Sequence, residues 1–235
     1  MTHLKEIFSQ MELELNDLQE EQFNKYTDLL IGYNKKVNLT SILEPSQINL
    51  KHYLDSVLPV HTGCFKDGMK VIDVGCGAGF PSVPLKIYMP SLKFTLLDSL
   101  NKRINFLNIL SDALDLSEIL TVHSRAEDAG HNEEFREKYD ICVARAVAPL
   151  NVLMEYCTPF VKVGGFFIAL KGKDGEAELE SSKKAMEILN VKLYDTLEFT
   201  LPGTDNQRKI YVFKKVSPTP KKYPRQAGKP TKSPL

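Results

Sequence analysis

Several features are scarce in this sequence: it has no tryptophan, only four cysteines and no long apolar run. A membrane-spanning helix needs on the order of 20 consecutive, mostly apolar residues, so none is expected. The first residues, Met1 to Glu6, lack the basic-then-apolar order of a secretory signal peptide. No two cysteines form a C-x-x-C pair, which favours free and mostly buried thiols in a reduced compartment. We therefore expect a cytoplasmic protein without membrane attachment.

Net charge is also missing, because 30 basic and 30 acidic residues balance one another. The balance is uneven along the chain. Residues 217–235, hereafter the C-terminal segment, contain five basic residues, five prolines and no acid. The prolines are expected to exclude a helix or a central strand there. The segment is therefore either a disordered solubility tail or a strap that binds phosphates.

A cluster of glycines follows an apolar run directly. Gly75, Gly77 and Gly79 come after Val71 to Val74, so a strand is expected to enter a turn that has almost no side chains. Glycine lets the backbone approach a ligand closely and tolerates positive φ. A dinucleotide-binding loop would need its third glycine where this sequence has Phe80. A purely structural turn is the other alternative.

The pattern Asp-x-Gly-x-Gly-x-Gly, which begins at Asp73, resembles motif I of the S-adenosylmethionine-dependent methyltransferases. This resemblance implies the Rossmann-like class I fold, an α/β architecture whose mostly parallel seven-stranded sheet carries helices on both faces. Asp98 ends the next expected strand, nineteen residues after Gly79. An acid at about that distance from a glycine loop is placed to bind a ribose diol, whereas Asp98 alone would also suit a helix cap.

The apolar periods divide the chain into three parts. Residues 1–65 are expected to form a helical extension packed on the core, and residues 66–216 a Rossmann-like core in which strands and helices alternate. The C-terminal segment, 217–235, is the third part. The last two strands should form an antiparallel pair that finishes the sheet. We expect strands near 70–74, 92–98, 119–122, 139–143, 161–170, 192–200 and 208–215, and helices near 82–89, 101–113, 149–157 and 175–189.

In an open α/β sheet, ligands bind beyond the carboxyl ends of the strands. Ala126 and Glu127 follow the third expected strand and could border an adenine ring, with a solvated loop acid as the alternative for Glu127. Arg145 follows the fourth strand within a run of small apolar residues, so it needs an anionic partner. That partner is a cofactor carboxylate, a substrate phosphate or a protein acid such as Asp73. A purely structural salt bridge is the alternative.

Six stretches occur in the same order as in one family. They are Asn34–Thr40, His52–Ser56, Asp73–Pro81, Asp98–Arg103, Ala144–Ala148 and Tyr223–Pro230. From about residue 20 to the C-terminus, the sequence resembles the bacterial small-subunit ribosomal RNA methyltransferase G family, formerly called glucose-inhibited division protein B. The family often has a tryptophan before the first stretch, where this sequence has Tyr33. An aromatic ring is retained, so we expect the same reaction.

The resemblance implies transfer of a methyl group from S-adenosylmethionine to N7 of guanine 527 of 16S rRNA in the small ribosomal subunit, with S-adenosylhomocysteine as the product. No metal is expected, and nothing demands more than a monomer. The glycine loop and the resemblance together predict a set of cofactor-binding residues. They are Asp73, Gly75, Gly77, Gly79, Phe80, Asp98, Ala126, Glu127 and Arg145.

Guanine N7 has a lone pair and no proton to lose, so its methylation depends on positioning and we expect no catalytic acid or base. Arg145 and Lys171, which closes the fifth strand, are the leading candidates to orient the substrate. Residues expected on the other side of the cleft are Asn38, His52, Asp55 and Ser56, although His52 could equally be a packing residue. Residues expected to bind RNA phosphates are Lys35, Lys36, Lys221, Lys222, Arg225, Lys229 and Lys232.

Two other functions fit the same motifs. A methyltransferase for a small molecule or a protein would be favoured by a closed lid and a rim that is not basic. A ribosome-associated module that binds RNA without catalysis is the second alternative. The intact glycine loop and Asp98 argue against that loss of activity.

Overall fold

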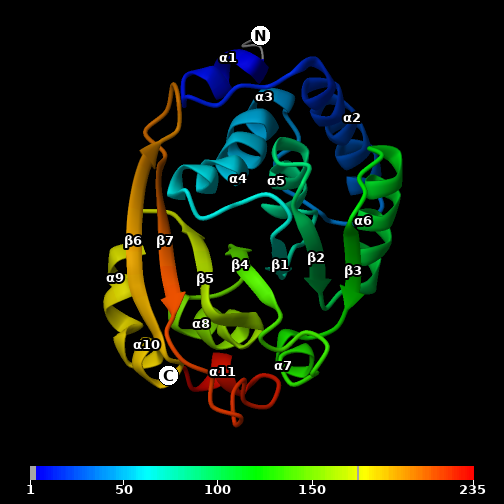
Figure 1. The fold of residues 1–235 in the computed structure, drawn as a ribbon. Coiled ribbons are helices and arrows are strands. Elements are labelled where there is room, and N and C mark those ends of the chain that lie inside the picture. The colour runs from blue at the N-terminus through cyan, green and yellow to red at the C-terminus, as the bar shows by residue number, and fades with distance from the viewer. Residues whose placement is uncertain (1–3, 174) are drawn as a thin grey trace.

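The computed structural model describes residues 4–173 and 175–235. Within them, seven strands form one sheet in the order β3-β2-β1-β4-β5-β7-β6 (Figure 1). Strands β1 to β5 run parallel to one another, and β7 runs antiparallel to both β5 and β6. The strands are β1 (Lys70–Val74), β2 (Lys93–Asp98), β3 (Ile119–His123), β4 (Tyr139–Arg145), β5 (Val161–Lys171), β6 (Val191–Thr200) and β7 (Gln207–Lys215). Each predicted strand is present, with ends within two residues of those expected.

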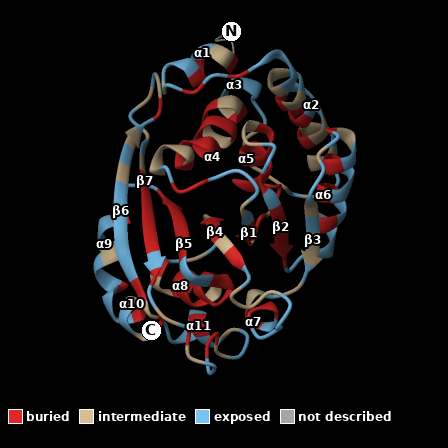
Figure 2. Ribbon diagram, viewed as in Figure 1, coloured by how far each residue is buried: buried red, intermediate tan, exposed pale blue. Residues whose placement is uncertain are grey.

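The central strand β1 shows how the sequence specifies both faces of the sheet. Successive side chains on a strand point to opposite faces. Val71 accordingly packs in the hydrophobic cluster of one face and Ile72 in that of the other. Both are buried, as an apolar run in a parallel sheet covered by helices predicts. Figure 2 shows that the central strands are largely buried, whereas the edge strand β6 is largely exposed.

Two groups of helices cover the two faces (Figure 1). On one face, α5 (Ser82–Tyr88) and α6 (Asn101–Ala113) contact β2, and α2 (Asp17–Asn34) packs on both helices. On the other face, α8 (Leu150–Cys157) contacts β4 and β5. Around it lie α7 (Ala126–Ala129), α9 (Gly175–Ser181), α10 (Lys183–Ile188) and α11 (Lys229–Lys232).

The N-terminal extension is helical, as predicted, although its first three residues lie outside the described part. It comprises α1 (Leu4–Ser9), α2, α3 (Pro45–Ile48), a π-helical turn over Asn49–Leu54, α4 (Asp55–Val57) and a 3₁₀ turn over Leu58–Thr62. Asn16 begins α2 with a capping box, in which its side chain and that of Gln19 each accept from the other's backbone N–H. Pro45 occupies the first turn of α3, where a backbone N–H would have no partner within the helix, so proline costs no hydrogen bond there. The boundary at residue 65 stays a prediction.

Three sequence expectations need correction. The helix expected over 175–189 is two helices, α9 and α10, separated at Ser182, whose hydroxyl donates to the Glu178 carbonyl at 2.7 Å. The short helix α7 was not predicted. The prolines do not exclude a helix from the C-terminal segment, because Pro230 lies in the first turn of α11. The segment also packs against the core, with Tyr223, Pro224 and Pro230 buried.

Two predicted absences can be compared with the described residues. No helix among them is both long and apolar enough to cross a membrane. The four cysteines are free and buried, which agrees with the expectation from their spacing.

Candidate functional site

The glycine loop connects β1 to α5 and is held by the neighbouring strand. The N–H of Gly75 donates to the Leu97 carbonyl at 2.8 Å, which carries the β1–β2 pairing into the loop. All three loop glycines have positive φ. A Cβ on Gly75 would lie 2.7 Å from Val147, and one on Gly79 would lie 2.9 Å from the Tyr26 hydroxyl. These close approaches need glycine, whereas a Cβ on Gly77 would meet no atom within 4 Å and leaves room for a ligand.

Two buried acids support this loop. Asp98 is 2% exposed, and its Oδ2 accepts from the Gly77 N–H at 2.9 Å and from Arg103 at 3.2 Å, while Oδ1 accepts from Leu100 N–H. Asp73 is fully buried and accepts from the Ser82 N–H at 3.2 Å. Its Oδ1 has no hydrogen-bond partner among the described residues. Burial raises the pKa of Asp73 to about 7.

A cavity of about 340 Å³ opens beside the loop, and we call it the glycine-loop cavity. It lies beyond the carboxyl ends of β1 to β4, where the strand order reverses between β1 and β4, as expected for an open α/β sheet. Of the predicted cofactor-binding residues, four line it: Gly75, Asp98, Ala126 and Glu127. The other lining residues are Val74, Leu97, Ser99, Ser124, Arg125, Val147, Ala148, Pro149, Tyr156 and Thr231.

Glu127 is not the solvated loop acid considered as an alternative, because it is 7% exposed. Its Oε1 accepts from the Gly228 N–H at 3.0 Å. Near it, the hydroxyl groups of Tyr156 and Thr231 lie 3.0 Å apart, and both residues line the cavity. Gly228 and Thr231 belong to the C-terminal segment, which therefore contributes directly to this cavity.

A second cavity of about 580 Å³ adjoins the first, and we call it the cation-lined cavity. Val147, Ala148 and Pro149 line both cavities, and we call this shared wall the partition. The preceding Ala146 has a φ of 55°, a left-handed conformation that costs energy for a residue with a Cβ. Five side chains with basic groups line this cavity: Lys51, His52, Arg145, Lys171 and Arg208.

Arg145 projects from the end of β4 and is paired with Asp55. Its Nη1 donates to Asp55 Oδ2 at 3.1 Å, and its guanidinium lies 5.0 Å from the Phe80 ring centre. Asp55 in turn accepts from Arg208 Nε at 2.8 Å. The protein acid that pairs with Arg145 is therefore Asp55 and not Asp73, because the N-terminal extension brings α4 to the end of β4.

His52 and Phe80 form a stacked pair with ring centroids 4.3 Å apart. Arg145 donates to His52 Nδ1 at 3.3 Å, and Nε2 lies 2.7 Å from the Thr40 hydroxyl, so the ring carries its proton on Nε2. Burial and the Arg145 charge lower the pKa of His52 to about 4. His52 is therefore neutral at pH 7. It packs on Phe80 and lines the cation-lined cavity at the same time.

Lys171 closes β5 beside the same cavity, where the sequence placed it. Its Nζ donates to the Ala148 carbonyl at 2.8 Å and pairs with Glu178 at 2.7 Å. Glu178 also accepts from the Leu150 N–H at the start of α8. Lys171 thus fastens the partition to α9.

Other predicted site residues lie elsewhere. Asn38 is exposed, Ser56 is buried, and neither lines either cavity. The Phe80 ring packs between His52 and Tyr26 and does not line the glycine-loop cavity, and its contact with the cofactor stays a prediction. The exposed lysines among the predicted phosphate contacts are Lys35, Lys36, Lys221, Lys222, Lys229 and Lys232.

Arg225 differs from those lysines because its guanidinium is already engaged. Its Nη2 lies 2.6 Å from Glu155 Oε2 and its Nε 2.9 Å from Oε1, and Glu155 is 1% exposed. A bidentate ion pair of this kind holds the arginine side chain in one orientation. Arg225 therefore helps to attach the C-terminal segment to α8, and its contact with RNA stays a prediction.

Sequence reasoning missed Lys51, Arg208, Tyr156 and Thr231. A signal existed for Arg208: the first residues of an antiparallel strand lie at the edge where its parallel neighbours end, and Arg208 is the second residue of β7, beside the end of β5. Tyr156 and Thr231 had no such signal, since 75 residues separate them. Among the described residues, no group of three or more His, Cys, Asp or Glu side chains is arranged to hold a metal ion.

Comparison with known proteins identifies relatives of this chain. The family model for rRNA small subunit methyltransferase G matches residues 19–211. The ribosomal RNA small subunit methyltransferase G of Lactobacillus acidophilus is 51% identical over 229 residues, which cover 97% of this chain and 95% of that protein. The protein of the same name from Acetivibrio thermocellus is 54% identical over 224 residues, which cover 94% and 90% of the two chains.

A solved structure resembles the fold at low sequence identity. M. jannaschii TYW2 in complex with AdoMet aligns with a TM-score of 0.52 and 13% identity, over 68% of this chain and 77% of that one. At this identity the likeness bears on the fold alone. Together with the strand order, it confirms the predicted Rossmann-like class I methyltransferase fold.

Proposed function

Because the chain belongs to the rRNA small subunit methyltransferase G family, we propose that it transfers a methyl group from S-adenosylmethionine to 16S rRNA of the small ribosomal subunit. The proposed acceptor is N7 of guanine 527, which is what the sequence resemblance implies. One observation carries the proposal: a glycine-lined cavity with buried acids adjoins a cavity lined by cations, across a partition of three small residues. Such a pair of sites suits a nucleoside donor and an anionic acceptor.

The glycine-loop cavity fits the methyl donor. Gly77 leaves open space above the loop, and the Asp98 carboxylate, which lines the cavity at the end of β2, is proposed to bind the ribose diol. Ala126 and Glu127 border the region proposed for the adenine ring. When bound, S-adenosylmethionine supplies an electrophilic methyl group on a sulfonium.

The residues of this chain would contribute position and not proton transfer. Guanine N7 attacks with a lone pair and releases no proton, so a base would have nothing to remove. His52, with a pKa of about 4, holds no ionisable proton to donate at pH 7. The expected contribution is alignment of the reacting atoms about 3–3.5 Å apart before reaction.

The cation-lined cavity is proposed to hold the guanine and its phosphates. Arg145 and Lys171 line this cavity from the ends of β4 and β5. Arg208 and Lys51 add positive charge beside them. A guanidinium stacks on a base or binds a phosphate, and Asp55 fixes the planes of both arginines before RNA arrives.

The target base must leave its stack to enter such a cavity. The exposed lysines of α11 and of the loop before it, Lys221, Lys222, Lys229 and Lys232, are proposed to bind the surrounding phosphates. Lys35 and Lys36, after α2, are proposed to do the same from the N-terminal extension.

Incubation with labelled methyl donor tests the proposal. Purified protein, small subunits that lack the modification and S-adenosylmethionine labelled in the methyl group are combined, and the labelled nucleotide is mapped by nuclease digestion and mass spectrometry. Label on N7 of guanine 527 is expected. Label in a protein or in a small molecule would favour the first alternative function, and RNA binding without any label would favour the non-catalytic module.

A further inference from the structure

The C-terminal segment does more than carry lysines. We propose that Gly228 and α11 (Lys229–Lys232) complete the methyl-donor pocket, by fixing the Glu127 carboxylate and by supplying Thr231 to the cavity wall. This inference rests on the proposed use of the glycine-loop cavity for S-adenosylmethionine. It makes Gly228 and Thr231 positioning residues for the donor, in a stretch that sequence reasoning treated as a phosphate-binding tail.

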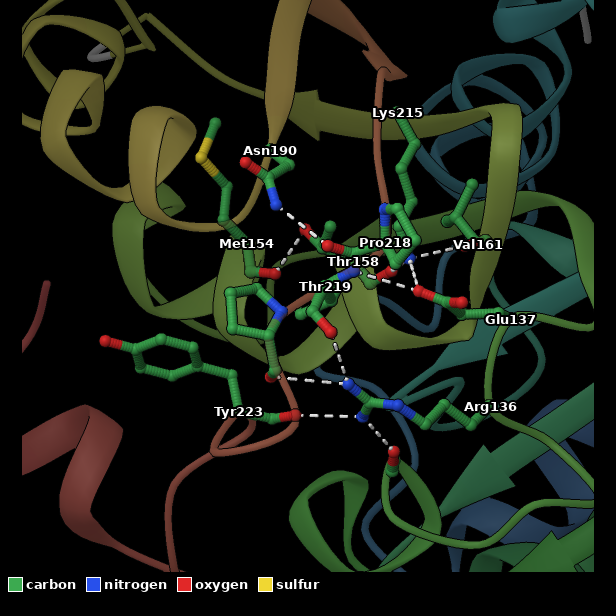
Figure 3. A network of polar contacts seen from close by, with 12 residues as sticks. Arg136, Glu137, Met154, Thr158, Val161, Asn190, Lys215, Pro218, Thr219 and Tyr223 are labelled. Carbon is green, nitrogen blue, oxygen red and sulfur yellow. Dashed lines mark hydrogen bonds and ion pairs between the residues drawn. The ribbon is translucent and has the colours of Figure 1, made fainter.

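The segment is anchored first by Arg136, which donates only to backbone carbonyls (Figure 3). Its Nη1 reaches the carbonyls of Gly130 and Tyr223 at 2.7 and 2.8 Å, and its Nη2 reaches that of Thr219 at 2.9 Å. One guanidinium thus joins the loop after α7 to two points of the segment. Because charged donors to carbonyls form the stronger class of hydrogen bond, this junction holds the path of the chain.

A buried ion pair fixes the point where β7 passes into the segment. Lys215 has a fully buried side chain, and its Nζ lies 2.7 Å from Glu137 Oε1. The same oxygen accepts from the Thr219 N–H at 2.9 Å (Figure 3). The ammonium also donates to the carbonyls of Thr158 and Val161, so the charge is satisfied within the protein.

A second clamp lies between these anchors and the cavity. The Glu155 carboxylate, on α8, accepts hydrogen bonds from both the guanidinium and the backbone N–H of Arg225. His131 Nε2 lies 2.7 Å from the Pro224 carbonyl. Pro224 packs so closely that a Cβ on Gly130 would lie 2.8 Å from its ring. The chain therefore arrives at residue 228 with little freedom.

The last two contacts involve residues that line the glycine-loop cavity. Gly228 donates to Glu127 Oε1, and this bond orients a carboxylate that lines the cavity. The Thr231 hydroxyl forms a hydrogen bond with the Tyr156 hydroxyl, and both residues line the glycine-loop cavity. A carboxylate with one oxygen held by a backbone N–H is oriented before the ligand binds, which lowers the entropic cost of binding.

Two truncated chains test this inference without RNA. A chain ending at Ala227 keeps the Arg136 and Glu155 anchors and loses Gly228 and α11, whereas a chain ending at Lys232 keeps them all. S-adenosylhomocysteine is titrated into each by calorimetry, beside the full chain. We expect roughly tenfold weaker binding for the first truncation and an unchanged affinity for the second, on the scale of one or two hydrogen bonds. Equal affinity for all three chains would overturn the inference.

Thr231 provides a second test that does not depend on how a truncated chain folds. Thr231→Val removes the hydroxyl that meets Tyr156, and Thr231→Ser keeps it. We expect Thr231→Val to raise the KM for S-adenosylmethionine roughly three- to tenfold with little change in kcat, and Thr231→Ser to restore it. A fall in kcat at constant KM, or equal values for both variants, would contradict the inference. A full chain that bound no S-adenosylhomocysteine would instead refute the proposed function itself.

Discussion

The N-terminal extension and the C-terminal segment both reach the candidate site, but they are attached to the core by different contacts. The extension packs through aromatic side chains: Phe23, Tyr26 and Tyr53 are fully buried in the same hydrophobic cluster as β1. The segment is held by charged and polar groups, of which Arg136 and Glu155 are the principal ones. One attachment removes apolar surface from water, and the other depends on directed hydrogen bonds.

This difference predicts different contributions to the molecule. Apolar burial is large and not directional, so the extension should be part of the cooperative folding unit. Directed polar bonds yield a smaller net free energy but fix positions, so the segment should matter more for geometry than for global stability. Each prediction below tests one side of this contrast.

The largest effect is expected for Tyr53→Ala. The Tyr53 ring lies 4.7 Å from that of Phe23 and 5.2 Å from that of Tyr26, so its removal leaves a cavity where the extension meets the core. We expect the free energy of unfolding to fall by about 3–5 kcal/mol in urea titrations. Tyr53→Phe, which removes only the hydroxyl bonded to Thr27, should lose about 1 kcal/mol. A separate early transition confined to the extension would break the comparison.

Acid should weaken the attachment of the extension through His52. The pKa of His52 is lowered from its ordinary 6.5 to about 4, so between these values the unfolded chain binds a proton that the folded chain does not. The contribution of His52 to stability should therefore fall as the pH falls from 6.5 to 4, by up to about 3 kcal/mol. Asp73 titrates over much of the same range with the opposite sign, because burial raises its pKa to about 7. The difference between the wild type and His52→Gln isolates the histidine, and parallel curves for the two would contradict the prediction.

Arg145→Ala should separate activity from stability. We expect methyl transfer to fall on the order of 100-fold, because the acceptor loses an orienting group. Stability should fall by only about 1 kcal/mol, since Asp55 keeps Arg208 as a partner. Rates from methyl-transfer assays and midpoints from thermal unfolding decide the question. A large loss of stability with a proportionate loss of activity would mean that the Arg145–Asp55 pair is only structural.

Arg136→Ala tests the polar attachment directly. We expect a loss of about 2 kcal/mol or less in global stability, but much faster tryptic cleavage at Lys221 and Lys222, because carbonyls of the segment lose their donor. The neighbouring exposed Lys138→Ala serves as the control. Unchanged proteolysis would show that the remaining clamps suffice.

The smallest expected effect concerns charge alone. Replacing Lys221, Lys222, Lys229 and Lys232 by Gln should weaken RNA binding about tenfold at physiological salt and lower the slope of log affinity against log salt by roughly 0.7 per lost phosphate contact. Affinity for S-adenosylhomocysteine and thermal stability are the accompanying measurements. An unchanged salt slope would show that these lysines do not contact RNA.

The sequence was most informative where chemistry depends on local order. The strand-loop-acid pattern of Asp73, Gly75 and Asp98 predicted where the glycine-loop cavity lies, because glycine geometry and strand ends can be inferred within about 30 residues of chain. The pairing of Arg145 with Asp55 was not predictable in the same way. It depends on where a π-helical turn and α4 place an acid from a different part of the chain.

The attachment of the C-terminal segment was the least predictable feature. Arg136 donates to backbone carbonyls, and every residue carries a carbonyl, so no partner residue type appears in the sequence. The basic and proline-rich composition of the segment favoured either a disordered solubility tail or a strap that binds phosphates. The single turn of α11 and its contact with Tyr156 follow from the three-dimensional path and not from that composition.

The partition of Val147, Ala148 and Pro149 belongs to both cavities. Because the two cavities share this wall, neither can be reshaped alone: a bulky side chain introduced at Ala148 would narrow both of them, and with them the sites proposed for the nucleoside donor and for the target base. An elongated inhibitor that lies across the partition would occupy both cavities and compete with both proposed ligands. A substitution in the partition that weakened binding of this inhibitor would also impair turnover by the enzyme.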